Sequence, residues 1–201
     1  MVTLGLGRVG CGGMFEANPG APLRRALLCA LTVLTALLGG AAQAAEGGTG
    51  DSVWSRVTLV VPVYTHHFPD GGGFDDRNWG AFVDVALGEH WSVVGGDYVN
   101  SFHRNTAFAG ASFSPVSLDL GRVRLRPGVL AGLDLSGGYR GRNPVEPLLG
   151  ALELHLTGQG FQGAGAGILN RAGLALILFP GGMSQRGSIP VSLAATYRLG
   201  P

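Results

Sequence analysis

Two histidines and a serine form the first candidate for chemistry in this sequence. His66 and His67 end a strand-like apolar run, and Ser101 lies in the segment "DYVNSFHRN". A histidine close to a serine can take the hydroxyl proton, and the serine then attacks an acyl carbonyl. A third group, often a carboxylate, orients the imidazole and stabilises its positive charge. We therefore treat His67 and Ser101 as a candidate pair for acyl transfer, with solvated strand ends as the alternative.

Polar residues gather in three clusters, two of which include His67 and Ser101. Each cluster follows the end of a different predicted strand, the first, third and fifth of an up-and-down arrangement, so all three are expected at one rim. Arg140 and Arg142 are expected to bind phosphates at the membrane surface by bidentate hydrogen bonds, with loop solubility as the alternative. Asp76 and Arg77 are expected to bind a lipid headgroup, with a surface ion pair of little energetic value as the alternative. The clusters are His66, His67, Asp70, Asp75, Asp76 and Arg77; Asp97, Asn100, Ser101, His103 and Arg104; and Arg140, Arg142 and Glu146.

Neither a metal nor another cofactor is expected. His66 and His67 are adjacent on a predicted strand, so their side chains face opposite sides and rarely bind one ion. Both cysteines, Cys11 and Cys29, lie in or before a predicted export signal. The mature chain is therefore expected to have no disulfide and no thiolate chemistry.

The first 45 residues are expected to be a signal peptide with an upstream extension. Two arginines precede an apolar run at Ala26–Leu38, and Ala42–Ala44 has the small residues of a cleavage site. This run is shorter than the roughly 20 apolar residues that a membrane-spanning helix needs. The predicted boundaries are 1–45 for this leader and 46–201 for a single exported domain.

The composition excludes two classes of protein. The chain has 201 residues and a mean hydropathy of +0.28, which is too apolar for a disordered chain despite 36 glycines. All 14 basic residues are arginines, and from residue 46 onward 11 arginines stand against 12 acidic residues. This balance offers no basic face for nucleic acid.

Hydrophobic residues alternate with polar or small ones along most of the exported segment. Alternation with a period of two predicts β-strands, because successive side chains point to opposite faces. It is strict over Val123–Leu135, where Val129 and Leu133 fall on the apolar face. The longer alternating strands keep one face apolar, while the other carries arginine, acidic residues, histidine and glycine. The eight predicted strands are Val57–His67, Trp79–Gly88, Trp91–Ser101, Thr106–Ser114, Val123–Leu135, Leu148–Thr157, Ala166–Phe179 and Val191–Leu199.

These strands predict an all-β fold, an eight-stranded antiparallel up-and-down transmembrane β-barrel in the outer membrane. Most of them have about the 9–11 residues that cross a bilayer as a tilted strand. Tight turns alternate with longer loops, and apolar faces outside a small polar interior are typical of such barrels. The interior of eight strands is just wide enough for packed side chains or one small ligand. A soluble two-sheet β-protein is the alternative, because it shows the same period.

Four segments, in order, resemble signature segments of the outer-membrane lipid A palmitoyltransferases (the PagP family). In "VPVYTHHF", Pro62 stands five residues before His67, as a proline precedes the catalytic histidine of the family. "FDDRNWG" is similar to its aromatic-x-x-Arg-x-Trp-Gly segment, and "VNSF" stands where the family has Lys-Asp-Ser-Trp. A later "PVEP" is similar to a segment before the sixth strand. The resemblance covers roughly Val57–Thr157.

The resemblance implies an enzyme that moves an acyl chain, typically palmitate, from a phospholipid to lipid A. It implies a monomeric barrel with its active site at the outer mouth and an apolar pocket that measures the chain. His67 would match the catalytic histidine, Ser101 the catalytic serine, and Asn100 the position of an aspartate. An asparagine can orient a histidine, but it would not stabilise the imidazolium as a carboxylate does. Asn100 therefore favours an alternative, a non-catalytic barrel that binds lipid or has a structural role.

Overall fold

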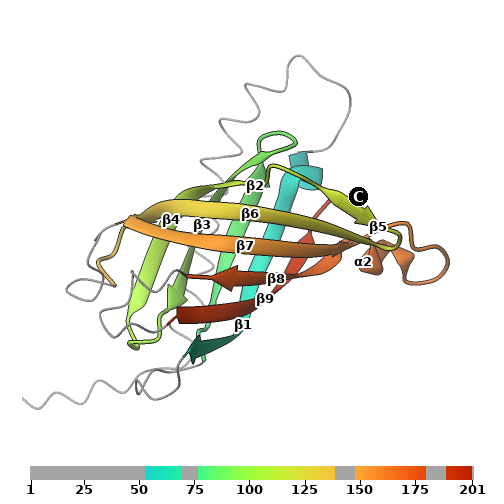
Figure 1. Cartoon of the computed structure of the whole chain (residues 1–201). Helices are drawn as coiled ribbons and strands as arrows, with labels where there is room; N and C mark the ends of the chain where they lie inside the picture. The colour runs from blue at the N-terminus through green and yellow to red at the C-terminus, as the bar shows by residue number, and fades with distance from the viewer. Residues whose placement is uncertain (1–52, 69–76, 139–147, 180–188, 201) are drawn as a thin grey trace, which may run out of the picture.

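The computed structural model describes residues 53–68, 77–138, 148–179 and 189–200. Eight antiparallel strands run in sequence order around a closed barrel, and the pairing of β4 with β6 closes it (Figure 1). No helix within these ranges is long and apolar enough to cross a membrane. The elements are η2 (Val53–Arg56), β1 (Val57–Phe68), β2 (Gly80–Ala86), β3 (Trp91–Val99), β4 (Asn105–Phe113), β5 (Leu118–Leu120), β6 (Val123–Asp134), β7 (Leu148–Gly158), α2 (Ala166–Leu169), β8 (Ala172–Leu178) and β9 (Ile189–Arg198).

The predicted barrel architecture is confirmed, and one predicted strand is too long. The sequence pattern predicts a strand over Ala166–Phe179, but Ala166–Leu169 forms the short helix α2 and β8 begins only at Ala172. Gly163 and Gly165 precede this helix with φ angles of 87° and 83°. A left-handed backbone of this kind suits glycine and cannot continue a strand. The apolar residues of α2 therefore belong to a connection between β7 and β8.

A second departure concerns Pro115–Gly121, which lies between two predicted strands. This segment contains the three-residue strand β5, which pairs with the beginning of β6 and extends the hairpin beyond β4. The guanidinium of Arg124 donates a hydrogen bond of 2.8 Å to the carboxylate of Asp119. This bond, with the attraction between the two charges, lowers the pKa of Asp119.

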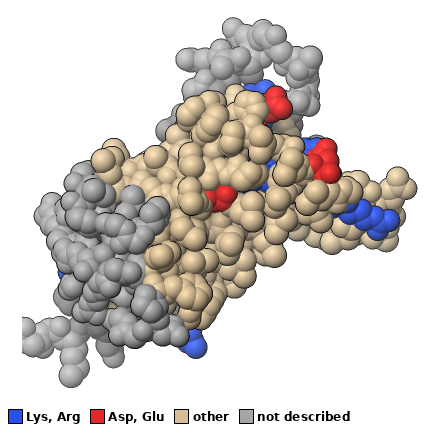
Figure 2. All heavy atoms as spheres, in the orientation of Figure 1, with Lys and Arg blue, Asp and Glu red and all other residues tan. Residues whose placement is uncertain are grey.

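The outer surface of the barrel is apolar where the sequence predicts an apolar face. Strands β6, β7, β8 and β9 carry aliphatic or aromatic side chains, or glycine in β7, at the outward positions and place their charged side chains at the inward ones. Few charged side chains interrupt the face of the barrel in view in Figure 2. The exposed outward residues include Val129, Leu133, Leu148, Leu152, Leu156, Leu174, Leu176 and Leu193.

Aromatic side chains fill much of the middle of the barrel. Phe82, Tyr98, Phe108 and Leu149 belong to one packed cluster, and the Phe82 ring centroid lies 5.3 Å from that of Tyr98. Gly132 lies directly against this cluster, because a Cβ atom there would come within 2.6 Å of the Phe108 ring. A glycine at this position makes room for the ring, and Phe108 in turn is only 5 % exposed.

Candidate functional site

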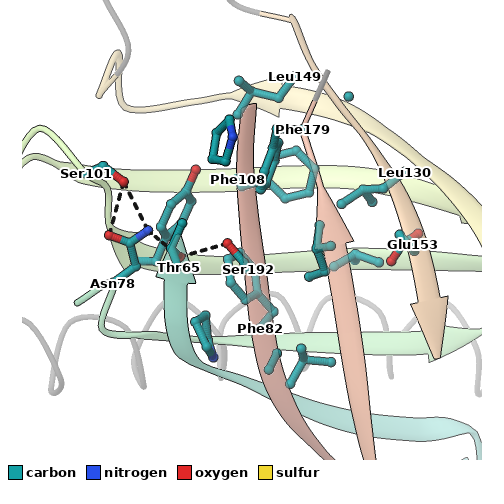
Figure 3. Close-up of a pocket in the computed structure, with 18 of the residues that line it drawn as sticks. Thr65, Asn78, Phe82, Ser101, Phe108, Leu130, Leu149, Glu153, Phe179 and Ser192 are labelled. Atoms are coloured by element: carbon teal, nitrogen blue, oxygen red, sulfur yellow. Dashed lines mark hydrogen bonds between the residues drawn. The ribbon is translucent and has the colours of Figure 1, made fainter. Parts of the chain in front are cut away.

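The barrel interior holds a cavity of about 110 Å³ (Figure 3). Phe82, Phe108, Leu130 and Ile177 belong to its apolar wall. Polar side chains line the cavity toward the end of the barrel at which β1 ends, and a second polar group lies deeper inside. The cavity therefore has an apolar middle between two polar ends.

A chain of hydrogen-bonded side chains lies at the first polar end. The Asn78 amide donates from Nδ2 to Thr65 Oγ1 at 2.8 Å and to Ser101 Oγ at 3.2 Å. Ser101 Oγ also donates to Asn78 Oδ1 at 3.4 Å, and Thr65 Oγ1 lies 2.8 Å from Ser192 Oγ. Figure 3 shows this chain of bonds, which connects β1, β9, the residue pair before β2 and the turn after β3. Ser101 is therefore held by Asn78 at the wall of the cavity.

His67 faces the same cavity because β1 contains a bulge. The register between β1 and β9 shifts between Pro62 and Tyr64, which makes Val63 an extra residue. Val63 and Tyr64 are 59 % and 46 % exposed, whereas Thr65 and His67 line the cavity and are buried. Without the bulge, the alternation that points Pro62 inward would turn His67 outward.

The pairing between β1 and β2 stops before the end of β1. The register between these strands runs from Val57 and Val85 to Val60 and Phe82, while β1 continues to Phe68. The hydrogen bond from Asn78 to Thr65 connects the two strands beyond their last paired residues. Asn78 is buried, with 8 % of its surface exposed.

Asn100, expected to take the place of the family's aspartate, has a different environment. It is completely buried, and its Nδ2 atom donates to Thr106 Oγ1 at 3.0 Å and to the Gly138 carbonyl at 3.1 Å. Its Oδ1 atom accepts hydrogen bonds from the backbone N–H groups of Phe102 and Arg104. An asparagine side chain has two donor hydrogens and two acceptor lone pairs, so these bonds use all of them. In this structure Asn100 anchors the turn after β3.

Of the four residues expected to bind a headgroup or phosphate, the structure describes Arg77 alone. Arg77 is exposed and directly precedes Asn78 at the same end of the barrel. Asp76, Arg140 and Arg142 lie outside the described residues. Described members of the first two clusters, His67 and Arg77 with Asn100 and Ser101, therefore lie at the same end of the barrel, whereas the third cluster lies outside the described residues.

The deeper polar end of the cavity combines carboxylates with a histidine. Glu153 accepts a hydrogen bond of 2.6 Å from Ser112 Oγ, and its other oxygen lies 3.0 Å from His155 Nε2. Asp84, which also lines the cavity, accepts a hydrogen bond of 3.1 Å from Ser92. Among the residues that the structure describes, no group of three or more histidine, cysteine, aspartate or glutamate side chains could hold a metal ion.

The sequence patterns do not single out Thr65, Asn78 and Ser192, which form a chain of hydrogen bonds with Ser101. Asn78 lies inside the segment "FDDRNWG", but the resemblance of this segment depends on its phenylalanine, arginine, tryptophan and glycine. Ser192 lies in the last predicted strand, and Thr65 stands two positions before His67. All three are polar residues on the inward face near the end of a strand, and this position was the signal that could have identified them.

Comparison with known proteins identifies no family for this chain. No family model matches the chain, and no curated protein matches it. A solved structure from "De novo design of transmembrane beta-barrels" is similar, with a TM-score of 0.41 and 13 % sequence identity. The match covers 71 % of this chain and 94 % of the designed chain. At this level the likeness carries no argument about activity.

Proposed function

We propose that this chain is an outer-membrane acyltransferase that moves an acyl chain from a phospholipid to lipid A, with His67 and Ser101 as its catalytic residues. One observation carries the proposal: a histidine and a serine line the polar end of a cavity whose middle is apolar. An apolar cavity suits a hydrocarbon chain, because each buried CH₂ group contributes about 0.8 kcal/mol. A polar end then holds the ester group at Ser101.

The location in a membrane is supported by the outer surface. Leu152 and Leu174, on neighbouring strands, are 52 % and 47 % exposed, and the outward faces of β6 to β9 carry no charged side chain at a described position. Apolar outward faces around a polar-ended interior are typical of membrane barrels. An exported chain with such a surface belongs in the outer membrane, where phospholipid and lipid A meet.

The proposed reaction is a double displacement. His67 takes the proton of Ser101, whose Oγ atom forms a bond to the ester carbonyl carbon of the phospholipid. The ester C–O bond breaks, and the lysophospholipid leaves with the proton from His67. A hydroxyl of lipid A then attacks the acyl-serine while His67 takes its proton. The Ser101–acyl bond breaks, and Ser101 recovers its proton from His67.

A second function, a barrel that binds lipid without catalysis, is favoured by Asn100. All four hydrogen-bonding positions of the Asn100 side chain are used by Thr106, the Gly138 carbonyl and the turn after β3, so this residue supplies no third member for a His67–Ser101 pair. The acyltransferase proposal therefore requires His67 to work without a carboxylate from this position.

Mass spectrometry of lipid A from expressing cells tests the proposal. Wild-type chain should add one acyl chain, and His67→Ala and Ser101→Ala should each abolish the addition. His66→Ala, which changes the adjacent histidine on the outward face, and Ser117→Ala, at an exposed serine, are matched controls that should keep it. Folding of each variant is checked by its heat-dependent migration in gels. If the wild-type barrel is folded and lipid A is unchanged, the acyltransferase proposal is contradicted and the non-catalytic function remains.

A further inference from the structure

We propose that Asn78 is the positioning residue of Ser101, an inference that rests on the proposed nucleophilic role of Ser101. Ser101 Oγ accepts from Asn78 Nδ2 at 3.2 Å and donates to Asn78 Oδ1 at 3.4 Å. Both residues line the cavity. The side-chain amide that contacts the proposed nucleophile is therefore that of Asn78, whereas Asn100 is bonded elsewhere.

The orientation of the Asn78 amide is fixed by a second set of bonds. Its Nδ2 atom also donates to Thr65 Oγ1 at 2.8 Å, and Thr65 lies 2.8 Å from Ser192 Oγ. Thr65 is 1 % exposed and Ser192 is 8 % exposed, so these bonds are shielded from water. Figure 3 shows the amide held between Thr65 on one side and Ser101 on the other. A side chain held in this way loses little freedom when Ser101 reacts.

This arrangement provides for both the resting and the reacting states of Ser101. In the resting state the hydroxyl proton points to Asn78 Oδ1. Rotation about the Cβ–Oγ bond redirects the proton to His67, since a hydroxyl hydrogen turns freely. The Nδ2–H group continues to donate to Oγ, and a donor favours the negative charge that develops as the proton leaves. Asn78 thereby raises the reactivity of Ser101 without contacting the substrate.

A serine-directed probe tests this role independently of lipid A. An alkyl fluorophosphonate forms a bond from Ser101 Oγ to phosphorus, fluoride leaves, and the serine proton passes to His67. Mass spectrometry of the purified, refolded barrel gives the maximal labelling rate, kinact, and the probe affinity, KI. Asn78→Asp keeps the size of the side chain and replaces the donor by an acceptor. We expect it to lower kinact at least about tenfold while KI changes less than about threefold.

Thr65 provides a second pair of variants should Asn78→Asp fail to fold. Thr65→Val removes the hydroxyl that fixes the amide and should also lower kinact, whereas Thr65→Ser should restore it. Asn105→Asp, at an exposed asparagine at the same end of the barrel, is the matched control and should label like the wild type. The unfolding midpoints of the serine and valine variants are also measured. If these midpoints are equal, a difference in kinact between the two variants does not come from a general loss of stability.

The outcomes distinguish this inference from the proposed function. If the probe labels Ser101 of the wild type, and labels the folded variants more slowly, the role of Asn78 is supported. This holds even if lipid A is unchanged, and in that case only the proposed acyl acceptor is wrong. Folded Asn78→Asp and Thr65→Val that label at the wild-type kinact would overturn the inference. A wild-type barrel whose Ser101 does not react with the probe would overturn it as well, together with the nucleophilic role of Ser101.

Discussion

The substitution Asn100→Asp separates the structural account of this residue from the catalytic one. The resemblance to the palmitoyltransferases places an aspartate here, so an aspartate would be expected to raise activity. The structure predicts destabilisation. Asn100 has no exposed surface, and its two N–H groups donate to Thr106 Oγ1 and to the Gly138 carbonyl. A carboxylate has no hydrogen to donate and places an oxygen against that carbonyl.

The expected cost follows from these contacts. Leaving the buried Gly138 carbonyl without a donor costs about 1–3 kcal/mol. Burying the new charge costs several kcal/mol more. The backbone N–H groups of Phe102 and Arg104 offset part of this cost, because hydrogen bonds to charged groups contribute about 1.5–3 kcal/mol. A net loss of about 3 kcal/mol remains, which is roughly a hundredfold in the folding equilibrium constant.

Urea unfolding of the purified barrel in detergent micelles, followed by tryptophan fluorescence, measures this loss as a lower midpoint at an unchanged slope. Asn105→Asp makes the same chemical change at an exposed site five residues later and should stay within about 0.5 kcal/mol of the wild type. An Asn100→Asp barrel as stable as this control, or one with increased acyl transfer, would refute the assignment of Asn100 to the turn.

Two further predictions test the interior packing and the membrane-facing surface. Gly132→Ala should lower the free energy of unfolding by about 1–3 kcal/mol, because the added Cβ meets the Phe108 ring and the Ala109 carbonyl; Gly88→Ala, where no atom lies within 4 Å of a Cβ, should be neutral in the same urea titration. Leu152→Arg should destabilise the barrel in phospholipid vesicles by about 2–4 kcal/mol if the residue faces lipid. Leu135→Arg, beyond the end of β6, is its control, and equal stability of both variants would contradict the membrane location.

Local patterns predicted the strands well, because the period of two is a property of each strand alone. Along β6, for example, Val129 and Leu133 were expected on an apolar face and are exposed on the outside of the barrel. The error at Ala166–Leu169 arose where apolar residues follow glycines, since composition does not reveal a left-handed backbone. A short run of apolar residues is equally compatible with a strand and a helix.

The candidate site was predicted only in part, because its geometry depends on contacts between distant residues. Alternation alone could not place His67, since its inward position depends on the extra residue Val63 in β1. Asn78 is separated from Thr65 by 13 residues and from Ser101 by 23, so their hydrogen bonds leave no local signal. Residue types and the resemblance both pointed to His67 and Ser101, but the resemblance suggested for Asn100 a role that the observed hydrogen bonds do not provide.

The central claim is acyl transfer at Ser101, and the most direct test uses purified barrel in vesicles of defined phospholipid and lipid A. The account predicts that acylated lipid A and lysophospholipid form in equal amounts with the wild type, and that neither forms with folded Ser101→Ala. Folded wild-type barrel that produces neither, or lysophospholipid and free fatty acid without acylated lipid A, would contradict the claim.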